Sequence, residues 1–145
     1  MILVDTNVLV YAVNIDAPRH ESSRALVEAV QAKRMHCVLA PQVLLEFFAI
    51  ITDPRRVAKP LEPQAAREQV RLLGAIFPVL DRCRQALDYF QEALAEKNVT
   101  GGDVFDAFLV ARMRAGGIAS ICTYNVKDFA GYKGIEARTP EAFLK

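Results

Sequence analysis

The sequence predicts a three-layer α/β fold with a central, mostly parallel sheet flanked by helices. Short apolar segments alternate along the chain with longer segments whose apolar residues recur at helical spacing. The strand-like segments Ile2–Val4, Cys37–Leu39 and Ile118–Cys122 are apolar except for Ser120, which is typical of strands buried on both faces of a parallel sheet. No internal repeat and no linker rich in Gly, Pro or Ser divides the 145 residues, so we expect one domain over residues 1–145.

The expected elements follow from these apolar segments and from the residues that bound them. The expected strands are Ile2–Val4, Cys37–Leu39, Ile118–Cys122 and a further short one near Ile135. The expected helices are Leu9–Val13, Ser22–Ala32, Pro41–Ile51, Pro63–Ile76, Ala86–Lys97, one from Asp103 to about Ala115, and a terminal one from Pro140. Pro41 suits a first helical turn, Asp103 can cap its helix, and Gly116-Gly117 can end it.

The composition limits the class of protein. A formal net charge of +1 excludes the strongly basic surface of a protein that coats nucleic acid, so any contact with nucleic acid must be local. The N-terminus has no basic region or cleavage site, and no apolar run approaches the roughly 18 residues of a membrane span. The cysteines Cys37, Cys83 and Cys122 lie far apart in or beside apolar segments, as reduced core residues do. We therefore expect a cytoplasmic protein without a membrane partner.

Polar side chains follow two of the expected strands directly. Asp5 follows the first strand, and Thr123 and Asn125 follow the late one. In open α/β folds, ligands bind beyond the carboxyl ends of the strands, so function is expected there. Asp5 could equally be the N-cap of the next helix, although Thr6 or Asn7 could also take that place.

A second acid, Glu46, is the only charge in the segment PQVLLEFFAII. An unpaired buried carboxylate costs several kcal/mol, so such a residue is normally paired, protonated or bound to a cation. The alternative is a helix at the surface that carries Glu46 on its solvent-facing side.

Further acids lie near the expected helix that begins at Asp103. Asp106 lies three residues after Asp103 and on roughly the same side of that helix. Capping explains Asp103 better than Asp106, which could instead favour the positive end of the helix dipole. Asp128 follows the late strand and, taken alone, reads as an ordinary turn residue.

Acids from separate segments, without a His or Cys pair, favour a hard cation such as Mg²⁺, for which Mn²⁺ can substitute. Because Mg²⁺ typically completes its coordination with substrate phosphate, the sequence predicts a metal-dependent phosphodiester hydrolase.

Four short motifs, in order and over nearly the whole chain, resemble the PIN-domain ribonucleases, and within them the VapC toxins of prokaryotic toxin–antitoxin pairs. VDTNVLVYA resembles the family's opening strand and acid, and PQVLLEFF its glutamate helix. DAFLVARM resembles the third-acid helix, and CTYNVKDF the closing Thr-x-Asn/Asp segment. The resemblance implies a PIN-like domain and a Mg²⁺-dependent endoribonuclease that cuts structured RNA such as tRNA or rRNA. It further implies a homodimer and a cognate VapB-type antitoxin as partner.

The resemblance also implies roles for individual residues. Asp5 and Asp106 would be the principal metal ligands, with Glu46 completing the coordination or orienting a water. Thr123 would support the site by hydrogen bonding. The family often has an aspartate where Asn125 stands, so either Asn125 contributes neutrally or Asp128 substitutes. Asp103 is an additional acid close to the pattern and ranks below Asp106.

Phosphate contacts could come from basic residues, since a site of several carboxylates must offset its repulsion of RNA. The candidates are Arg55, Arg56, Lys59 and Arg112.

Other readings of the acids fit less well. A haloacid-dehalogenase-like phosphatase needs a second Asp where Asn7 stands, and a receiver-like phosphoacceptor has no need for Glu46. A catalytically inactive PIN-like binding or scaffolding module is the alternative outside enzymology, and it predicts loss of acids that are intact here.

Overall fold

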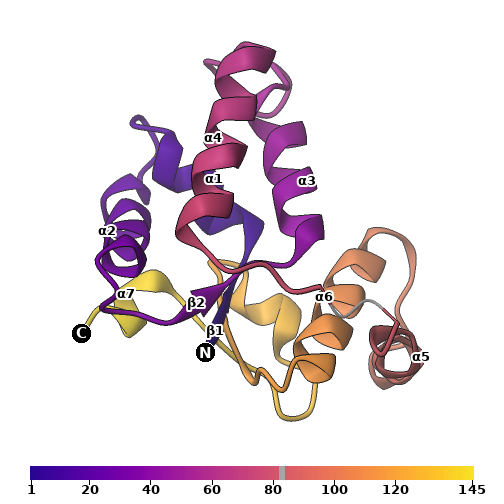
Figure 1. Cartoon of the computed structure of the whole chain (residues 1–145). Coiled ribbons are helices and arrows are strands. Elements are labelled where there is room, and N and C mark those ends of the chain that lie inside the picture. The colour runs from indigo at the N-terminus through magenta and orange to yellow at the C-terminus, as the bar shows by residue number, and fades with distance from the viewer. Residues whose placement is uncertain (82–83) are drawn as a thin grey trace.

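Four short strands form a parallel sheet at the centre of the computed structural model, which describes residues 1–81 and 84–145 (Figure 1). Their bounds are β1 Ile2–Val4, β2 Cys37–Val38, β3 Ser120–Cys122 and β4 Glu136–Arg138. The order in the sheet is β2-β1-β3-β4, and every neighbouring pair is parallel. The strands predicted from sequence and the parallel α/β class are therefore confirmed.

The strand order places a reversal of direction between β1 and β3. From β1 the chain moves outward to β2, whereas from β3 it moves outward to β4 on the other side. Such a switch point leaves a crevice beyond the carboxyl ends of the two central strands, where α/β proteins bind ligands. Asp5 and Thr123 are the residues that follow β1 and β3 directly. Both predicted site segments thus reach this crevice.

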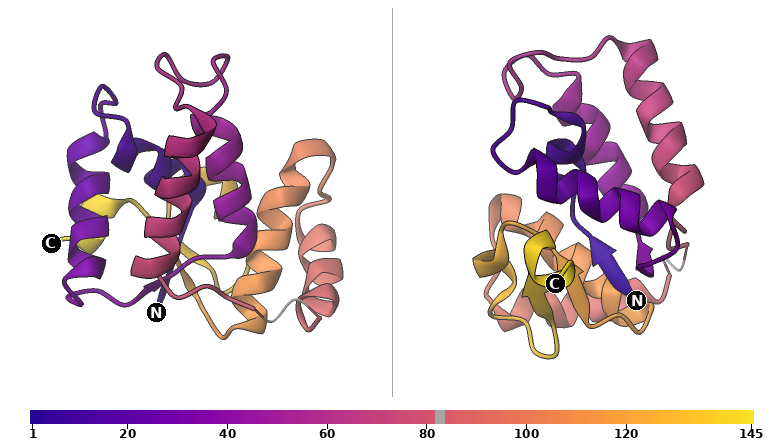
Figure 2. Two further views of the ribbon diagram at one scale, coloured as in Figure 1. Left: turned by 45° about the horizontal axis from the view of Figure 1, so that its top comes forward. Right: turned by 90° about the vertical axis from the view of Figure 1, so that its left-hand side faces the viewer.

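Helices cover the sheet on both sides. Their bounds are α1 Thr6–Val13, α2 His20–Gln31, α3 Pro41–Ile51, α4 Pro63–Ile76, α5 Ala86–Glu96, α6 Val104–Ala115 and α7 Pro140–Phe143. The helices of the first half of the chain gather on one side, and α5 and α6 lie together on the other (Figures 1 and 2). The core between them contains fully buried Leu3, Phe47, Ile121 and Phe129. The three-layer arrangement predicted from the sequence is confirmed.

The element boundaries differ from the sequence predictions in a few places. Helix α1 begins at Thr6 and not at Leu9, because Asp5 itself is its N-cap and its side chain accepts a hydrogen bond from the Thr6 N–H. Asp103 stands at the N-cap position of α6, but its side chain makes no capping hydrogen bond there. Gly101–Asp103 form a 3-10 turn instead, so the predicted capping role of Asp103 is wrong.

One pairing was missed in the sequence. Val79 forms a single parallel bridge with Leu39 beyond the end of β2, with backbone hydrogen bonds at 2.8 and 3.0 Å. A bridge of one residue beside Pro78 has no periodicity that could reveal it.

Two of the three cysteines are free and buried, as expected: Cys37 and Cys122. Burial raises the pKa of the Cys37 thiol to about 11. Cys83 lies outside the described residues. Within residues 1–81 and 84–145, none of the helices combines the length and the apolar character that crossing a bilayer requires.

Candidate active site

Asp5 combines the two roles that the sequence left open. It caps α1 through Oδ1, which accepts the Thr6 N–H at 2.7 Å. Its other oxygen, Oδ2, accepts the Thr123 hydroxyl at 2.7 Å and the Asn7 amide at 3.1 Å. The residue is 7% exposed, so these donors fix the direction in which the carboxylate faces.

A small network of polar groups holds Asp5 and Thr123 together across the two central strands. The Asn7 amide donates to Thr123 Oγ1 at 3.1 Å, and the Asn125 N–H donates to the same oxygen at 3.0 Å. Asn7 Oδ1 in turn accepts the Tyr124 N–H at 3.1 Å. Thr123 is fully buried, and its hydroxyl both donates and accepts hydrogen bonds. The polar groups that follow β1 and β3 are therefore satisfied by one another.

Glu46 reaches the same crevice from α3. The Thr6 hydroxyl donates to Glu46 Oε2 at 2.9 Å. The carboxylate is half-buried, and burial raises its pKa, opposed by the hydrogen bond from Thr6 and assisted by the charge of Asp5. Helix α3 is not buried on all sides, because Leu45 is 73% exposed. Glu46 nevertheless faces its polar partner and not solvent alone.

Asp106, in the first turn of α6, completes the group. The three acids line one hollow of about 290 Å³. The complete lining is Asp5, Thr6, Asn7, Val10, Tyr11, Glu46, Ile50, Arg56, Asp106 and Asn125. The fold therefore brings together three carboxylates that are separated by 41 and 60 positions along the chain: Asp5 before α1, Glu46 on α3 and Asp106 on α6.

The carboxyl of Asp106 is influenced both by burial and by the charges of the other acids. Burial, and then the negative charges of Asp5, Asp128, Asp103 and Glu46, raise the pKa of Asp106 to about 7. Burial also raises the pKa of Asp5, although the hydrogen bonds from Thr123, Thr6 and Asn7 oppose that rise. A cluster of this kind binds either a proton or a cation near neutral pH, because both relieve the repulsion.

The donor set suits a hard divalent cation. It consists of carboxylate oxygens with hydroxyl and amide oxygens nearby, which Mg²⁺ and Mn²⁺ prefer. Among the described residues, no three acidic, His or Cys side chains converge closely enough to enclose an ion by themselves. Mg²⁺ tolerates such a site, because it typically takes one or two protein carboxylates and keeps several waters.

The remaining predicted acids lie beside this hollow. Asp103 and Asp128 line a smaller neighbouring hollow of about 130 Å³, and Asp106 forms part of the wall of both. Asn125 lines the hollow of the three acids. Asn125 and Asp128 were the two candidates for a fourth site residue beside the three acids. Asn125 lies in the acidic hollow, whereas Asp128 acts on Asp106 through its charge.

The predicted basic residues separate into different places. Arg56 is exposed and lines the acidic hollow. Arg55 is exposed and bound to Asp53 through two hydrogen bonds of 3.1 Å. Arg112 is only 4% exposed, and its guanidinium donates to the Leu80 carbonyl at 2.8 Å. A phosphate contact needs an accessible cation, so burial removes Arg112 from the predicted RNA-binding set.

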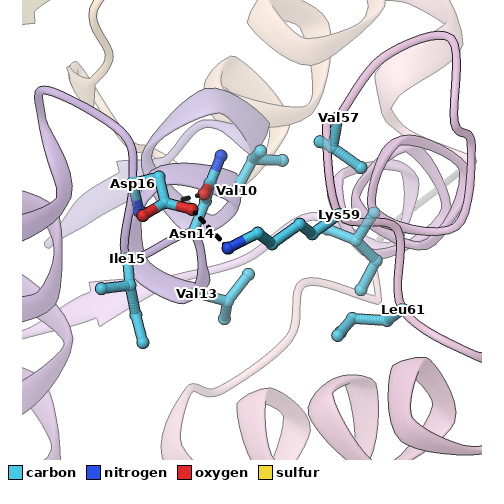
Figure 3. A pocket seen from close by; sticks show the side chains of 9 residues that line it. Val10, Val13, Asn14, Ile15, Asp16, Val57, Lys59 and Leu61 are labelled. Carbon is cyan, nitrogen blue, oxygen red and sulfur yellow. Dashed lines mark hydrogen bonds and ion pairs between the residues drawn. The ribbon is translucent and has the colours of Figure 1, made fainter.

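Lys59 lies in another hollow altogether. This hollow, of about 320 Å³, is mostly aliphatic and is formed by the end of α1 and the segment between α3 and α4 (Figure 3). Lys59 Nζ is 3.4 Å from Asp16 Oδ2 there, and the close-up shows the two side chains facing each other. Lys59 therefore does not line the hollow of the three acids.

Two lining residues were missed in the sequence analysis as site residues. Asn7 was considered only as a helix cap, yet its amide joins Asp5, Thr123 and Tyr124. Tyr11 lies one helical turn after Asn7 and lines the same hollow. The spacing of Asp5, Asn7 and Tyr11 at the start of an amphipathic helix is a signal that could have indicated both, since positions four apart share a face.

Comparisons with known proteins agree with this arrangement. The model of the PIN domain family matches residues 2–134. Ribonuclease VapC48 of Mycobacterium tuberculosis is 30% identical over 139 residues, which is 94% of each chain. A VapC ribonuclease of Mycobacterium bovis is 32% identical over 114 residues, 77% of each chain.

Solved structures show the same fold at lower identity. VapBC from Salmonella typhimurium, bound to DNA, matches with a TM-score of 0.70 and 19% identity, covering 97% of this chain and 99% of that one. VapC20 of Mycobacterium tuberculosis, described as a sarcin-ricin loop cleaving toxin, matches with a TM-score of 0.65 and 19% identity, covering 90% and 94%.

Proposed function

Since this chain belongs to the PIN domain family, with VapC ribonucleases among its relatives, we propose that it is a Mg²⁺-dependent endoribonuclease. We propose further that it is the toxin of a VapBC pair and hydrolyses structured RNA, such as tRNA or rRNA. Mn²⁺ is expected to substitute for Mg²⁺, because both prefer oxygen ligands.

The observation that carries this proposal is the meeting of Asp5, Glu46 and Asp106 in one hollow at the switch point of the sheet. A cluster with this much negative charge repels RNA unless a cation is present. Burial, and then the same repulsion, raise the pKa of Asp106 to about 7. The site thus suits a metal that neutralises the acids and draws phosphate toward them.

Each residue would make a separate contribution to hydrolysis. Asp5 and Asp106 would hold the divalent cation, which supplies Lewis acidity and charge neutralisation at the phosphate when bound. Glu46 would orient a water or accept its proton, which its raised pKa favours. Thr123 and Asn7 would keep Asp5 in position through their hydrogen bonds.

The proposed partners are a VapB-type antitoxin and a second copy of the chain. The solved neighbours include toxin–antitoxin complexes, which supports the first. An apolar surface between α3 and α4, lined by Leu44, Leu45, Phe48 and Val70, supports a homodimer. Light scattering on the purified chain measures its mass, and a monomer at micromolar concentration would exclude the homodimer.

Replacing Asp5 by Asn tests the catalytic assignment. Asn caps helices about as well as Asp, so the variant is expected to keep α1. Its single amide oxygen cannot replace both carboxylate oxygens as acceptors, so some loss of stability is expected, and a thermal melt establishes that the variant is folded. It removes one ligand charge, and we expect Mg²⁺-dependent cleavage of total RNA to fall by about a hundredfold or more. The measurement is the initial rate of cleavage at fixed Mg²⁺, followed by sequencing of the RNA ends.

Asp88→Asn is the matched control, because Asp88 is exposed on α5, away from the hollow. It should cleave at the wild-type rate. Equal cleavage by Asp5→Asn and wild type would refute the assignment of Asp5. A wild-type protein that cuts no RNA with either metal would favour a catalytically inactive binding module instead.

A further inference from the structure

Tyr11 is an aromatic side chain on the wall of the acidic hollow, and the proposed chemistry does not use it. It lies on α1 four residues after Asn7, so both side chains share the helix face that lines the hollow. The side chain is half-buried, and its backbone carbonyl is 2.9 Å from His20 Nδ1. This contact with His20 helps to fix the backbone of Tyr11.

A second tyrosine, Tyr124, packs against the Tyr11 ring. The rings of Tyr11 and Tyr124 meet edge to face, with centroids 5.5 Å apart and planes at 63°. The Arg19 guanidinium lies 4.5 Å from the centroid of the Tyr124 ring. Aromatic pairs favour this edge-to-face geometry. The pair therefore resists rotation of Tyr11 out of its place.

Tyr124 is itself fixed by polar contacts. Its hydroxyl donates to Glu141 Oε1 at 3.0 Å and lies 2.7 Å from Ser22 Oγ. Its backbone N–H donates to Asn7 Oδ1 at 3.1 Å, which ties it to the network around Asp5. The carboxylates and the Tyr11 ring are therefore held by one connected set of side chains, so their relative position is set in advance of binding.

The rest of the hollow divides into a polar and an apolar part. Asp5, Glu46 and Asp106 supply the acids, whereas Val10, Tyr11 and Ile50 supply an apolar lining. Arg56 adds a cation. Phosphate suits the polar part once a metal is present, but the apolar lining supplies no charge that could bind a phosphate. A planar nucleobase suits it, because bases stack on aromatic rings and pack on aliphatic groups.

We propose that Tyr11 stacks on the nucleobase next to the scissile phosphate, and that the RNA must be unpaired at that nucleotide. This inference rests on the proposed ribonuclease function and specifies its substrate. A base inside a helix presents only its edge to a side chain, so stacking requires a loop, bulge or single strand. Tyr11 is then a binding residue that selects unpaired positions within structured RNA.

The kinetic test compares Tyr11→Phe, Tyr11→Leu and the control Tyr89→Leu. Stacking contributes about 1–3 kcal/mol per base, so Tyr11→Leu is expected to raise KM about 5- to 150-fold. The effect should fall on KM with little change in kcat, as expected for a contact made equally in ground and transition states. Tyr11→Phe keeps the ring and should behave as wild type. Tyr89 is exposed on α5, and Tyr89→Leu should also be unchanged.

A binding test separates this inference from the proposed function. Short single-stranded oligoribonucleotides, each with 2-aminopurine at a different position, are titrated with protein in Ca²⁺ in place of Mg²⁺. Ca²⁺ also takes oxygen ligands and so offsets the charge of the acids, and a gel of each sample checks that the oligonucleotide stays intact. Stacking on Tyr11 should quench the fluorescence at one position with wild type and Tyr11→Phe, and leave it unquenched with Tyr11→Leu. Thermal melts of all variants establish that they are folded.

Equal KM values for Tyr11→Leu and Tyr89→Leu, or equal quenching by wild type and Tyr11→Leu, would overturn the stacking role. A wild-type protein that quenches 2-aminopurine through Tyr11 but cleaves no RNA would retain this inference and reject the proposed catalysis.

Discussion

Replacing Asp106 by Asn is expected to abolish RNA cleavage and, at the same time, to stabilise the metal-free protein. Cleavage should fall by about a hundredfold or more, because one of the two proposed metal ligands loses its charge. Stability should rise because the burial of Asp106, and then the charges of several other acids, raise its pKa to about 7. A residue that lowers stability and is still retained is typical of a functional site.

The pH dependence follows from the direction of this shift. A carboxyl whose pKa is higher in the folded state than in the unfolded state loses stability as pH rises between those two values. For Asp106 that window runs from its ordinary value of 3.8 to about 7. The stability difference between Asp106→Asn and wild type should therefore be small near pH 4 and reach its full size above pH 7. Since the carboxylate is only half-buried, solvent screening limits this difference to about 1–2 kcal/mol.

Urea unfolding in EDTA at pH 4, 6 and 8 measures this difference directly. Mg²⁺ added at pH 8 should then raise the stability of wild type and leave the stability of Asp106→Asn unchanged, because only wild type retains the Asp106 carboxylate as a ligand. A variant that is no more stable than wild type at pH 8, or that responds equally to Mg²⁺, would contradict the role given to Asp106.

Replacing Thr123 by Val is expected to give the second large effect. The fully buried hydroxyl donates to Asp5 Oδ2 and accepts from both Asn7 and Asn125. Valine has a similar shape but leaves these three groups without that partner, which should cost about 2–3 kcal/mol of unfolding free energy. Loss of the donor should also raise the pKa of Asp5 further, because that hydrogen bond stabilises its ionised form.

An Asp5 carboxylate that is harder to ionise and less well oriented should bind the metal about 10- to 100-fold more weakly. Losses of this size are common when a group that orients a metal ligand is removed. The cleavage rate as a function of Mg²⁺ concentration measures this shift, and excess Mg²⁺ should restore part of the rate. Thr123→Ser is the control, because it keeps the hydroxyl and loses one methyl, at a cost of about 1 kcal/mol. If Thr123→Val needed no more Mg²⁺ than Thr123→Ser, the supporting role of Thr123 would be wrong.

The fold was predictable because its signals are local. The segments Ile2–Val4 and Ser120–Cys122 are apolar except for Ser120 and are followed by the polar residues Asp5 and Thr123, and the helices carry clear apolar spacing. The misplaced start of α1 has a physical cause, since Asp, Thr and Asn all cap helices and the sequence cannot show which one does. The bridge at Val79 depends on a distant partner, Leu39, and has no local pattern.

The site was predictable as a set of acids with Thr123 and Asn125 beside them, but not in its detail. Position after a strand indicated Asp5, and isolation within an apolar segment indicated Glu46. Which way a side chain faces depends on packing, so the sequence could not show that Arg112 is buried or that Lys59 faces Asp16. For the same reason Asn7 and Tyr11 were missed: their part in the site depends on Thr123 and Tyr124, more than a hundred residues later.

The most direct test of the central claim is a crystal structure of the protein soaked in Mn²⁺, with anomalous diffraction recorded to locate the ion. The account predicts an anomalous peak in the hollow of Asp5, Glu46 and Asp106, within about 2.5 Å of oxygens of Asp5 and Asp106. The same soak of Asp5→Asn crystals should give no peak there. A well-occupied Mn²⁺ held by other residues, or no ion in this hollow at millimolar Mn²⁺, would contradict the assignment.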